Sequence, residues 1–278
     1  MPPVILADVV AAMERLYPIA TAQPWDQIGL VTGDLEQPVR RIHFALDPTL
    51  AVIEEARAVG ADVLITHHPL LLRGVHSVAT TSAKGASITS LVVGDVALYV
   101  AHTNADVAPR GVSDALAAAC NLEDITPLVM ENGQPTGRLG SLPAEVTLRE
   151  FAAALADRLP KAAGGIRVAG PPDAPVRRVA VLGGAGDSLF GAVRASRADV
   201  YVTADLRHHP ALEAREEARG GPPYLIDAGH WATESLWLAH VERDLIGELG
   251  VALDSDQDAQ VDTSISQLCT DPWTFVVD

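Results

Sequence analysis

Residues 39–68, VRRIHFALDPTLAVIEEARAVGADVLITHH, contain the pattern that decides the fold. They align without a gap with residues 176–205, VRRVAVLGGAGDSLFGAVRASRADVYVTAD, so the chain contains a duplicated unit. Each copy predicts a βαβ unit with a right-handed crossover. The expected strand, helix and strand are 42–46, 49–59 and 63–66 in the first copy, and 179–182, 188–196 and 200–203 in the second. The fold class is therefore α/β, with two similar domains that each form a mixed sheet flanked by helices.

The rest of the chain predicts further elements around the two copies. We expect a strand over 96–101, helices over 112–120 and 148–159, and a long helix over 230–249 that Gly250 ends. Thr147 and Glu150 form a capping box at the start of the second of these helices. The Gly- and Pro-rich stretch 128–142 is expected to be a crossover, and 164–175 a loop. These boundaries predict a metal-binding domain over 1–127 and 224–278, and a second domain over 128–223.

Composition limits the classes of function. The chain has 278 residues, is 48% hydrophobic and has a net charge of -16, which disfavours nucleic acid because phosphates are bound by clustered Lys and Arg. The N-terminus lacks the basic and apolar regions of a signal peptide, and no apolar run has the length of a membrane span. We therefore expect a cytoplasmic protein with no membrane partner. Cys120 and Cys269 lie far apart without a partner motif, so no disulfide framework is expected.

Two adjacent histidines, His67 and His68, follow the strand over 63–66. Pro69 ends that strand, and open α/β sheets bind ligands at the carboxyl ends of their strands. The pair could bind a metal. It could equally lie in a solvated loop, or one imidazole could bond to a backbone carbonyl.

His230 and Glu234 are four residues apart on the long C-terminal helix and share one face. The same stripe continues through Trp237, Val241 and Leu245, so its first turn should direct an imidazole and a carboxylate inward. A divalent cation would satisfy these buried polar groups. The alternative is an exposed pair on a frayed first turn.

The stretch 101–109, AHTNADVAP, follows another strand and contains His102 and Asp106. Asp106 could offer both carboxylate oxygens to a metal, whereas His102 could orient a ligand. The alternative role of Asp106 is a helix cap, but the expected helix begins several residues later. The resulting set is too large for one catalytic zinc and predicts two metals bridged by carboxylates and a water. Its members are His67, His68, Asp106, His230 and Glu234. Mixed nitrogen and oxygen ligands suit Zn, Fe, Mn, Co or Ni.

The motifs WDQIGLVTGD, ITHHPLL, AHTNAD, VTADLRHHPALEA and IDAGHWATE, in this order, resemble the Nif-three-like family, whose members are often labelled GTP cyclohydrolase I type 2 homologues. The resemblance covers essentially the whole chain, and the five ligand positions match residue by residue. It implies two divalent metal ions per subunit and a homohexamer, built as a trimer of dimers, with sites facing an internal cavity. Gln27 and Ala204 depart from the family pattern, which leaves the roles of Asp26 and Asp205 open.

The leading hypothesis is a dinuclear metal-dependent hydrolase, GTP cyclohydrolase type 2-like by its label, that acts through a metal-bridging water on a small molecule. His102 and His209 are the candidates for an additional general acid or base. Asp205, His208 and His209 could line the cavity, or could be a helix cap with solvated histidines, and Asp26 is expected to be structural. The alternative hypothesis is a non-catalytic hexameric metal-binding scaffold or metal chaperone.

Overall fold

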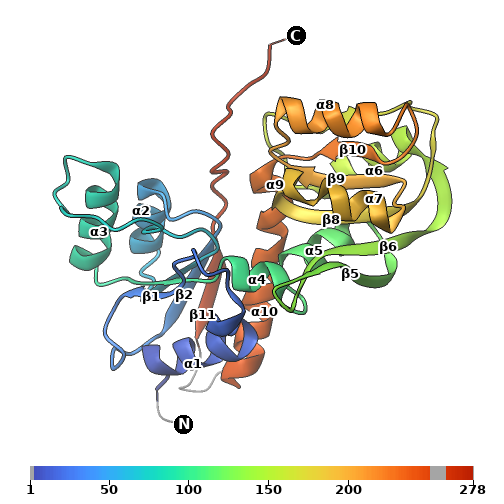
Figure 1. Cartoon of the computed structure of the whole chain (residues 1–278). Coiled ribbons are helices and arrows are strands. Elements are labelled where there is room, and N and C mark those ends of the chain that lie inside the picture. The colour runs from blue at the N-terminus through green and yellow to red at the C-terminus, as the bar shows by residue number, and fades with distance from the viewer. Residues whose placement is uncertain (1–2, 251–260, 278) are drawn as a thin grey trace. The chain divides into compact units, whose positions relative to one another are not determined.

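A computed structural model describes residues 3–250 and 261–277 of the chain. It divides into two compact units (Figure 1). Unit 1 comprises Met1–Ala105 and Leu238–Thr270, and unit 2 comprises Asp106–Trp237 and Asp271–Asp278. Each unit is a mixed β-sheet with helices on both faces, which confirms the predicted fold class.

The boundaries of these units differ from the expected ones. The sequence predicted one domain over 1–127 and 224–278 and a second domain over 128–223. Helix α5 (Val112–Ala119) packs on strand β8 (Pro175–Ala185) of unit 2. Strand β10 (Tyr224–Asp227) pairs in parallel with β9 (Val200–Ala204) of the same unit. Both elements bury their apolar side chains in unit 2, and Asp106, His230 and Glu234 belong to that unit with them.

In the described part of unit 1, five strands pair in the order β1-β4-β3-β2-β11. Strands β2, β3, β4 and β11 run parallel, and β1 is antiparallel to β4. The strands are β1 (Gly29–Thr32), β2 (Arg41–Ala45), β3 (Val63–Thr66), β4 (Ala97–Val100) and β11 (Asp262–Ile265). The helices are α1 (Leu6–Leu16), α2 (Leu50–Ala58), α3 (Ala83–Val93) and α10 (Leu238–Leu249), with a 3-10 turn at Ile19–Thr21.

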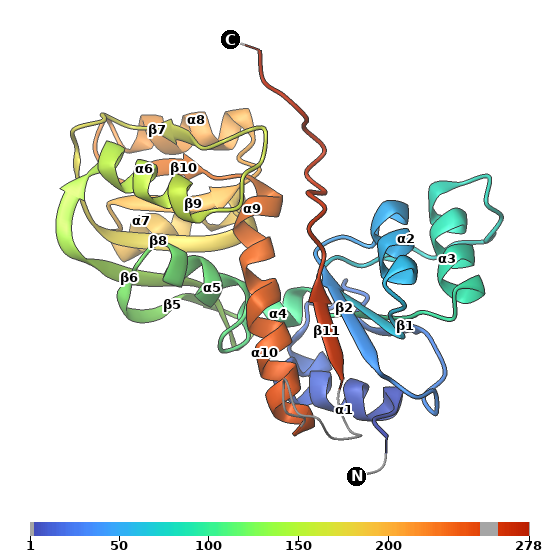
Figure 2. The same cartoon turned by 180° about the vertical axis from the view of Figure 1, so that it is seen from behind.

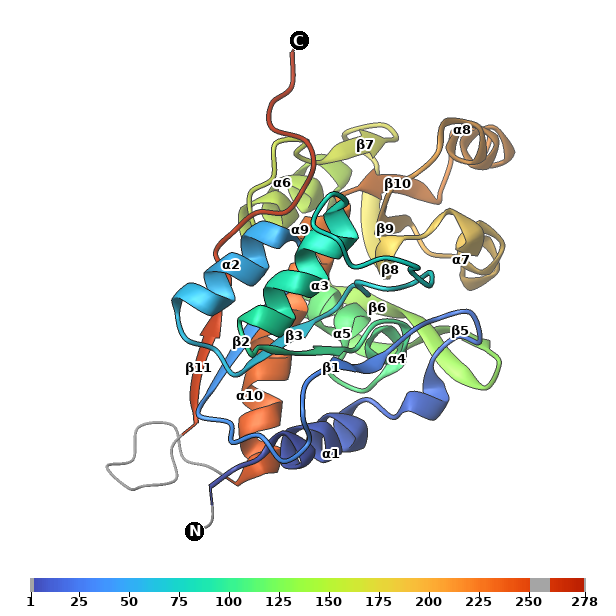
Figure 3. The ribbon, with the colours of Figure 1, turned by 90° about the vertical axis from the view of Figure 1, so that its left-hand side faces the viewer.

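The two faces of this sheet are covered by different helices, as Figure 3 shows. Leu64 and Leu98 pack with Ile53 of α2 and Leu91 of α3 in one apolar cluster. Ile65 lies next to Leu64 in β3 and so points to the other face, where α10 contacts β2 and β11 and also packs against α1. Because β3 is buried on both faces, its carboxyl end is held rigidly in the middle of the sheet.

In the described part of unit 2, six strands pair in the order β5-β6-β8-β9-β10-β7, which can be followed in Figure 2. Strands β8, β9 and β10 are parallel, and the others join antiparallel. The remaining strands are β5 (Glu123–Glu131), β6 (Gln134–Thr147) and β7 (Arg167–Ala169). The remaining helices are α6 (Leu148–Arg158), α7 (Phe190–Ser196), α8 (His208–Glu217) and α9 (His230–Glu234), with 3-10 turns at Asp187–Leu189 and Ser235–Trp237.

Side chains along the strands of unit 2 point alternately to the two faces of the sheet, and each face has its own apolar cluster. Val179 and Val200 face α5, α6 and α9, whereas Ala180 and Tyr201 face α7 and α8. The unit is therefore a three-layer α/β/α arrangement like unit 1, and its parallel strands also direct their carboxyl ends to one edge of the sheet.

A matching pair of aspartates confirms the duplication in three dimensions. Asp62 accepts hydrogen bonds from the backbone N–H groups of Arg40 and Arg41, at 2.7 and 2.9 Å. Asp199, at the aligned position of the second copy, accepts them from Arg177 and Arg178 at 2.9 and 2.7 Å. In both copies this carboxylate ties the start of the second strand to the start of the first.

Three sequence expectations are corrected. The predicted crossover over 128–142 lies in a hairpin of β5 and β6, turned by Asn132 and Gly133 with φ of 51° and 78°. Asn-Gly is the preferred pair for such a two-residue turn, because both residues tolerate positive φ. The predicted loop over 164–175 contains β7, and a 3-10 turn interrupts the helix predicted over 230–249.

Among residues 3–250 and 261–277, no helix is long and apolar enough to cross a membrane.

The capping box predicted at Thr147 is present at the start of α6. The Thr147 hydroxyl accepts a hydrogen bond from the N–H of Glu150, and the Glu150 carboxylate accepts from the N–H of Thr147 at 2.8 Å. The Thr147 hydroxyl also donates to this carboxylate at 2.8 Å, and the bonds from the Thr147 N–H and hydroxyl lower the pKa of Glu150 below its ordinary value of 4.5. We expect Thr147→Ala to lower the free energy of unfolding by about 1 kcal/mol at pH 7, measured by urea denaturation.

The pH dependence of this effect provides its check. A carboxylate with a lowered pKa in the folded state stabilises the protein above the pKa of the unfolded state, and this contribution is lost as the pH falls through the folded value. The difference between Thr147→Ala and the unmodified protein should therefore shrink below about pH 4. A difference that stays constant down to pH 3 would contradict the assignment.

Candidate metal site

Three histidines lie together at the carboxyl ends of two neighbouring strands in unit 1. His67 and His68 follow β3, and His102 follows β4, which pairs in parallel with β3. One ring nitrogen of each lies within 4.8 Å of the others, and the ring centroids are 5.0 to 5.5 Å apart. His67 is fully buried, and His68 and His102 are half-buried.

Each of these imidazoles donates its Nδ1–H to a different oxygen. His67 donates to the carbonyl of Ala101 at 2.9 Å. His68 donates to Asp47 at 2.7 Å, and His102 donates to Asp26 at 2.9 Å. These bonds select the tautomer whose lone pair is on Nε2, the arrangement that orients histidines toward metals. A backbone carbonyl was the competing explanation for a single histidine, but here it holds His67 in the orientation that ligation needs.

Asp26, which was expected to be structural, is an anionic hydrogen-bond partner of this cluster. Burial by itself raises the pKa of its carboxyl group, but hydrogen bonds from His102 and Thr103 outweigh burial and lower it to about 2. The side chain is fully buried, and Oδ2 accepts from both the N–H and the hydroxyl of Thr103 at 3.0 and 2.6 Å. The carboxylate therefore stays ionised and holds the proton of His102 on Nδ1.

Helix α9 of unit 2 carries an imidazole and a carboxylate of its own. His230 Nε2 lies 3.1 Å from Glu234 Oε2, and the Glu234 side chain is 5% exposed. His230 donates Nδ1–H to Asp205 at 2.8 Å, so its lone pair is also on Nε2. The expected apolar stripe is confirmed, since Trp237, Val241 and Leu245 are fully buried. The alternative of an exposed, frayed pair is wrong because Glu234 is buried.

Gly184 provides the space that Glu234 occupies. Its φ is 70°, and a Cβ at this position would overlap Oε1 of Glu234 and lie 3.3 Å from His230 Nε2. Its N–H is bonded to the hydroxyl of Thr233 at 3.1 Å, which fixes the first turn of α9 against β8. Gly184 lies within β8 rather than in a turn, and its missing Cβ allows the close approach of this carboxylate.

Asp106 lies in the short helix α4 (Thr103–Val107), four residues after His102. The helix expected several residues later is present as α5, which begins at Val112, and α4 is an additional short helix that the sequence did not predict. The carboxylate is half-buried, and Asp106 is the first residue of unit 2. Gly111 is the N-cap residue of α5, so Asp106 does not cap that helix, and its role as a ligand stays a prediction.

The other predicted residue, His209, lies on α8 beside His208, with ring centroids 5.1 Å apart. Both side chains are exposed. Within the described chain, the groups of histidines and acids close enough to hold a metal do not include His209. Its role as an acid or base stays a prediction, and so does that of His102.

The sequence reasoning missed Asp47 and Gly184, which occupy equivalent positions of the two copies. Each lies eight residues after the first residue of its copy. Asp47 follows the end of β2, and Gly184 lies near the end of β8. Asp47 orients His68 and also accepts a hydrogen bond from Thr270, while Gly184 makes room for Glu234. The alignment of the copies contains the signal, because it places both residues at the carboxyl end of a parallel strand.

The donor set fits divalent transition metals. In unit 1, three imidazoles have an oriented Nε2. In unit 2, His230 has one as well, and Asp106 and Glu234 carry carboxylate oxygens. A buried histidine or glutamate is costly unless it has partners of opposite charge or a metal. These residues could therefore hold metal ions, with Zn, Fe, Mn, Co and Ni all compatible with mixed nitrogen and oxygen donors.

Comparison with known proteins identifies relatives along nearly the whole chain. Residues 4–271 match the family described as Duf34/NIF3 (NGG1p interacting factor 3). A protein of Streptomyces coelicolor named GTP cyclohydrolase 1 type 2 homolog is 48% identical, over 97% of this chain and 93% of the relative. A relative of the same name from Mycobacterium tuberculosis is 32% identical, over 97% of each chain.

Solved structures show the same fold. A Bacillus cereus protein related to NIF3 superposes with a TM-score of 0.86 and 26% identity, covering 99% of this chain and 100% of that one. Reduced HcgD from Methanocaldococcus jannaschii superposes with a TM-score of 0.75 and 30% identity, covering 94% and 97%.

Proposed function

Because this chain belongs to the Duf34/NIF3 family, we propose that it is a dinuclear metal-dependent hydrolase. The proposed ligands are His67, His68, Asp106, His230 and Glu234. The relatives named GTP cyclohydrolase 1 type 2 homolog make GTP the first substrate to test. The observation that carries the proposal is the common tautomer of the histidines, each of which has its Nδ1–H bonded to a fixed acceptor.

Divalent ions held by these residues would lower the pKa of a bound water and would polarise the bond that is hydrolysed. The chain's own residues prepare for this chemistry. Asp47 and Asp205 accept the Nδ1–H of His68 and His230, which leaves Nε2 of each ring as the atom that would bind a metal. Asp26 does the same for His102, whose Nε2 we propose as the atom that accepts a proton during hydrolysis.

The proposal is tested by metal content and turnover measured on the same protein. Protein loaded with Zn, Mn or Fe should retain two metal ions per chain and hydrolyse at least one of GTP, a phosphodiester or a cyclic amide. Asp106→Ala should lower both quantities, whereas Asp173→Ala, an exposed acid in a loop, should change neither. Turnover that persists unchanged in Asp106→Ala would refute the hydrolase mechanism. Two bound ions without turnover would favour the scaffold or chaperone function.

Asp205 offers a sharper test of how the ligands are oriented. Asp205→Asn keeps the shape of the side chain but weakens the acceptor for the His230 Nδ1–H, so metal affinity should fall about 10- to 100-fold. Competition with a chromophoric chelator measures this change. Asp157→Asn, on the exposed face of α6, is the matched control and should leave the affinity unchanged. Equal affinities for Asp205→Asn and the control would remove Asp205 from the site.

We also propose that the chain assembles into a homohexamer. The C-terminal segment supports self-association, since its large apolar side chains are exposed, with Trp273 at 70% and Phe275 at 76%. Light scattering on the eluting protein should give six times the 29.2 kDa of one chain. A mass of 29.2 kDa at micromolar concentration would contradict the assembly.

A further inference from the structure

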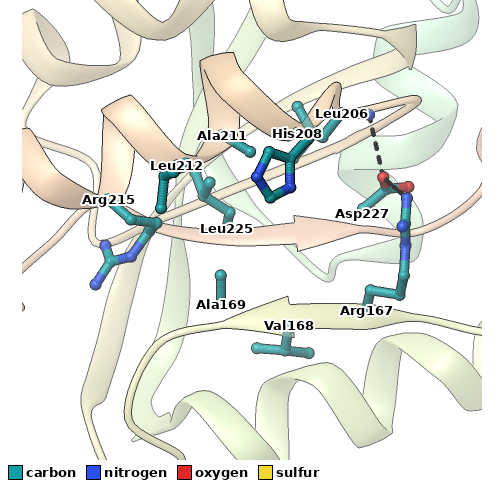
Figure 4. Close-up of a pocket in the computed structure, with 10 residues that line it drawn as sticks. All are labelled: Arg167, Val168, Ala169, Leu206, His208, Ala211, Leu212, Arg215, Leu225 and Asp227. Atoms are coloured by element: carbon teal, nitrogen blue, oxygen red, sulfur yellow. Dashed lines mark hydrogen bonds and ion pairs between the residues drawn. The ribbon is translucent and has the colours of Figure 1, made fainter.

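A cavity of about 340 Å³ lies in unit 2 between strands β7 and β10 and helix α8. Its volume is at the lower end of the range for small-molecule sites, about 300 to 1,000 Å³. None of its lining residues is a proposed metal ligand or orients one. Figure 4 shows apolar side chains in its middle, with Arg215 on one side and the pair of Arg167 and Asp227 on the other.

The walls of the cavity are apolar and partly uncovered. Val168 from β7 and Leu212 from α8 are 44% and 48% exposed, and Leu225 of β10 forms a buried part of the lining. Grouped apolar side chains in a concave surface gain free energy when an apolar molecule displaces water from them. The cavity therefore suits the hydrocarbon part of a ligand.

Arg215 places a positive charge at one side of this cavity. Its Nη1 donates to the carbonyls of Gly221 and Pro223, and its guanidinium carbon lies 5.3 Å from the centroid of the Tyr224 ring. These partners fix the guanidinium but are neutral. In the described part of the chain, no carboxylate forms an ion pair with Arg215.

The acidic residue of the cavity is already neutralised. Asp227 accepts hydrogen bonds from the Arg167 guanidinium and from the N–H of Leu206, and its side chain is 9% exposed. The Arg167 side chain is 72% exposed. The accessible charge in the lining is therefore positive, in a chain with a net charge of -16.

We propose that this cavity binds a small organic monoanion, with its apolar body against Val168, Leu212 and Leu225 and its anionic group on Arg215. The class includes aromatic and medium-chain aliphatic carboxylates. An anion is favoured over a neutral molecule because a guanidinium with neutral partners gains a charge-assisted hydrogen bond from a carboxylate. The proposal is independent of the metal chemistry, so either can fail alone.

The test uses probes that share an apolar body and differ in charge. The full-length protein, as purified, is titrated by calorimetry with 4-phenylbutyrate, 4-phenylbutanol and 4-phenylbutylamine, and with octanoate as an aliphatic anion. We expect one 4-phenylbutyrate per chain, binding at least about tenfold tighter than the alcohol, and no binding of the amine.

Three variants locate the bound probe. Arg215→Gln should weaken 4-phenylbutyrate at least about tenfold and leave the alcohol unchanged. Leu212→Asp changes an exposed side chain, so it should fold, and it should abolish binding of both anions. Arg219→Gln removes the same charge from an exposed position outside the cavity and should change nothing.

Each remaining outcome overturns the proposal. If neither anion binds, or if the alcohol binds as tightly as 4-phenylbutyrate, the cavity is not an anion site. Equal weakening by Arg215→Gln and Arg219→Gln would show that only the overall charge matters. A change in assembly mass for Leu212→Asp, without binding of any probe to the unmodified protein, would assign the cavity to an interface between chains.

Discussion

Replacing His67 by alanine should remove at least one of the two proposed metal ions and lower the affinity for the other. His67 is fully buried, and its ring is fixed by the Ala101 carbonyl and packed against His68 and His102. Outer hydrogen-bond partners of metal ligands account for about 10- to 100-fold in affinity, so loss of a ligand should exceed about 100-fold. Metal analysis after dialysis measures the stoichiometry, and chelator competition measures the affinity.

The control for this variant is His76→Ala, because His76 is an exposed histidine of the same unit. It should retain the metal content of the unmodified protein. Circular dichroism and thermal unfolding separate loss of metal from loss of fold. If His67→Ala remains folded and still holds two ions, His67 is not a metal ligand.

Gly184→Ala should combine a loss of stability with a loss of metal binding. A residue with a Cβ at φ of 70° costs about 1–2 kcal/mol, and this Cβ would also overlap the Glu234 carboxylate. Glu234 must then turn away from His230 Nε2, which removes a carboxylate ligand from the proposed set. We expect a lower midpoint in urea together with a decrease in metal affinity of more than about tenfold.

Gly133→Ala separates the two effects. Gly133 has φ of 78° in the β5–β6 turn, and a Cβ there meets nothing within 4 Å. This variant should therefore show the backbone cost alone, with unchanged metal affinity. Equal metal affinities for the two alanine variants would show that Glu234 does not depend on Gly184 and would weaken its assignment as a ligand.

The elements with strong local patterns were predictable from the sequence. The β3 range 63–66 and the α6 capping box at Thr147 agree with the structure, because burial on both faces and a helix cap are encoded by adjacent residues. The gapless repeat predicted two similar sheets, and the paired roles of Asp62 and Asp199 confirm it. The hairpin at Asn132 and Gly133 is also encoded locally, by the Asn-Gly pair, although the Gly- and Pro-rich composition of 128–142 indicates a crossover.

Periodicity and residue order are enough to predict which residue types could ligate a metal and at which strand or helix ends they lie. The hydrogen-bond partners that orient these side chains become visible only in the folded chain. Asp47 meets His68, and Asp205 meets His230, across 21 and 25 positions of sequence. The reason is physical, since a hydrogen bond or a steric overlap depends on positions in space that parallel pairing and helix packing create. No local sequence pattern predicts that Gly184 must leave room for the Glu234 side chain.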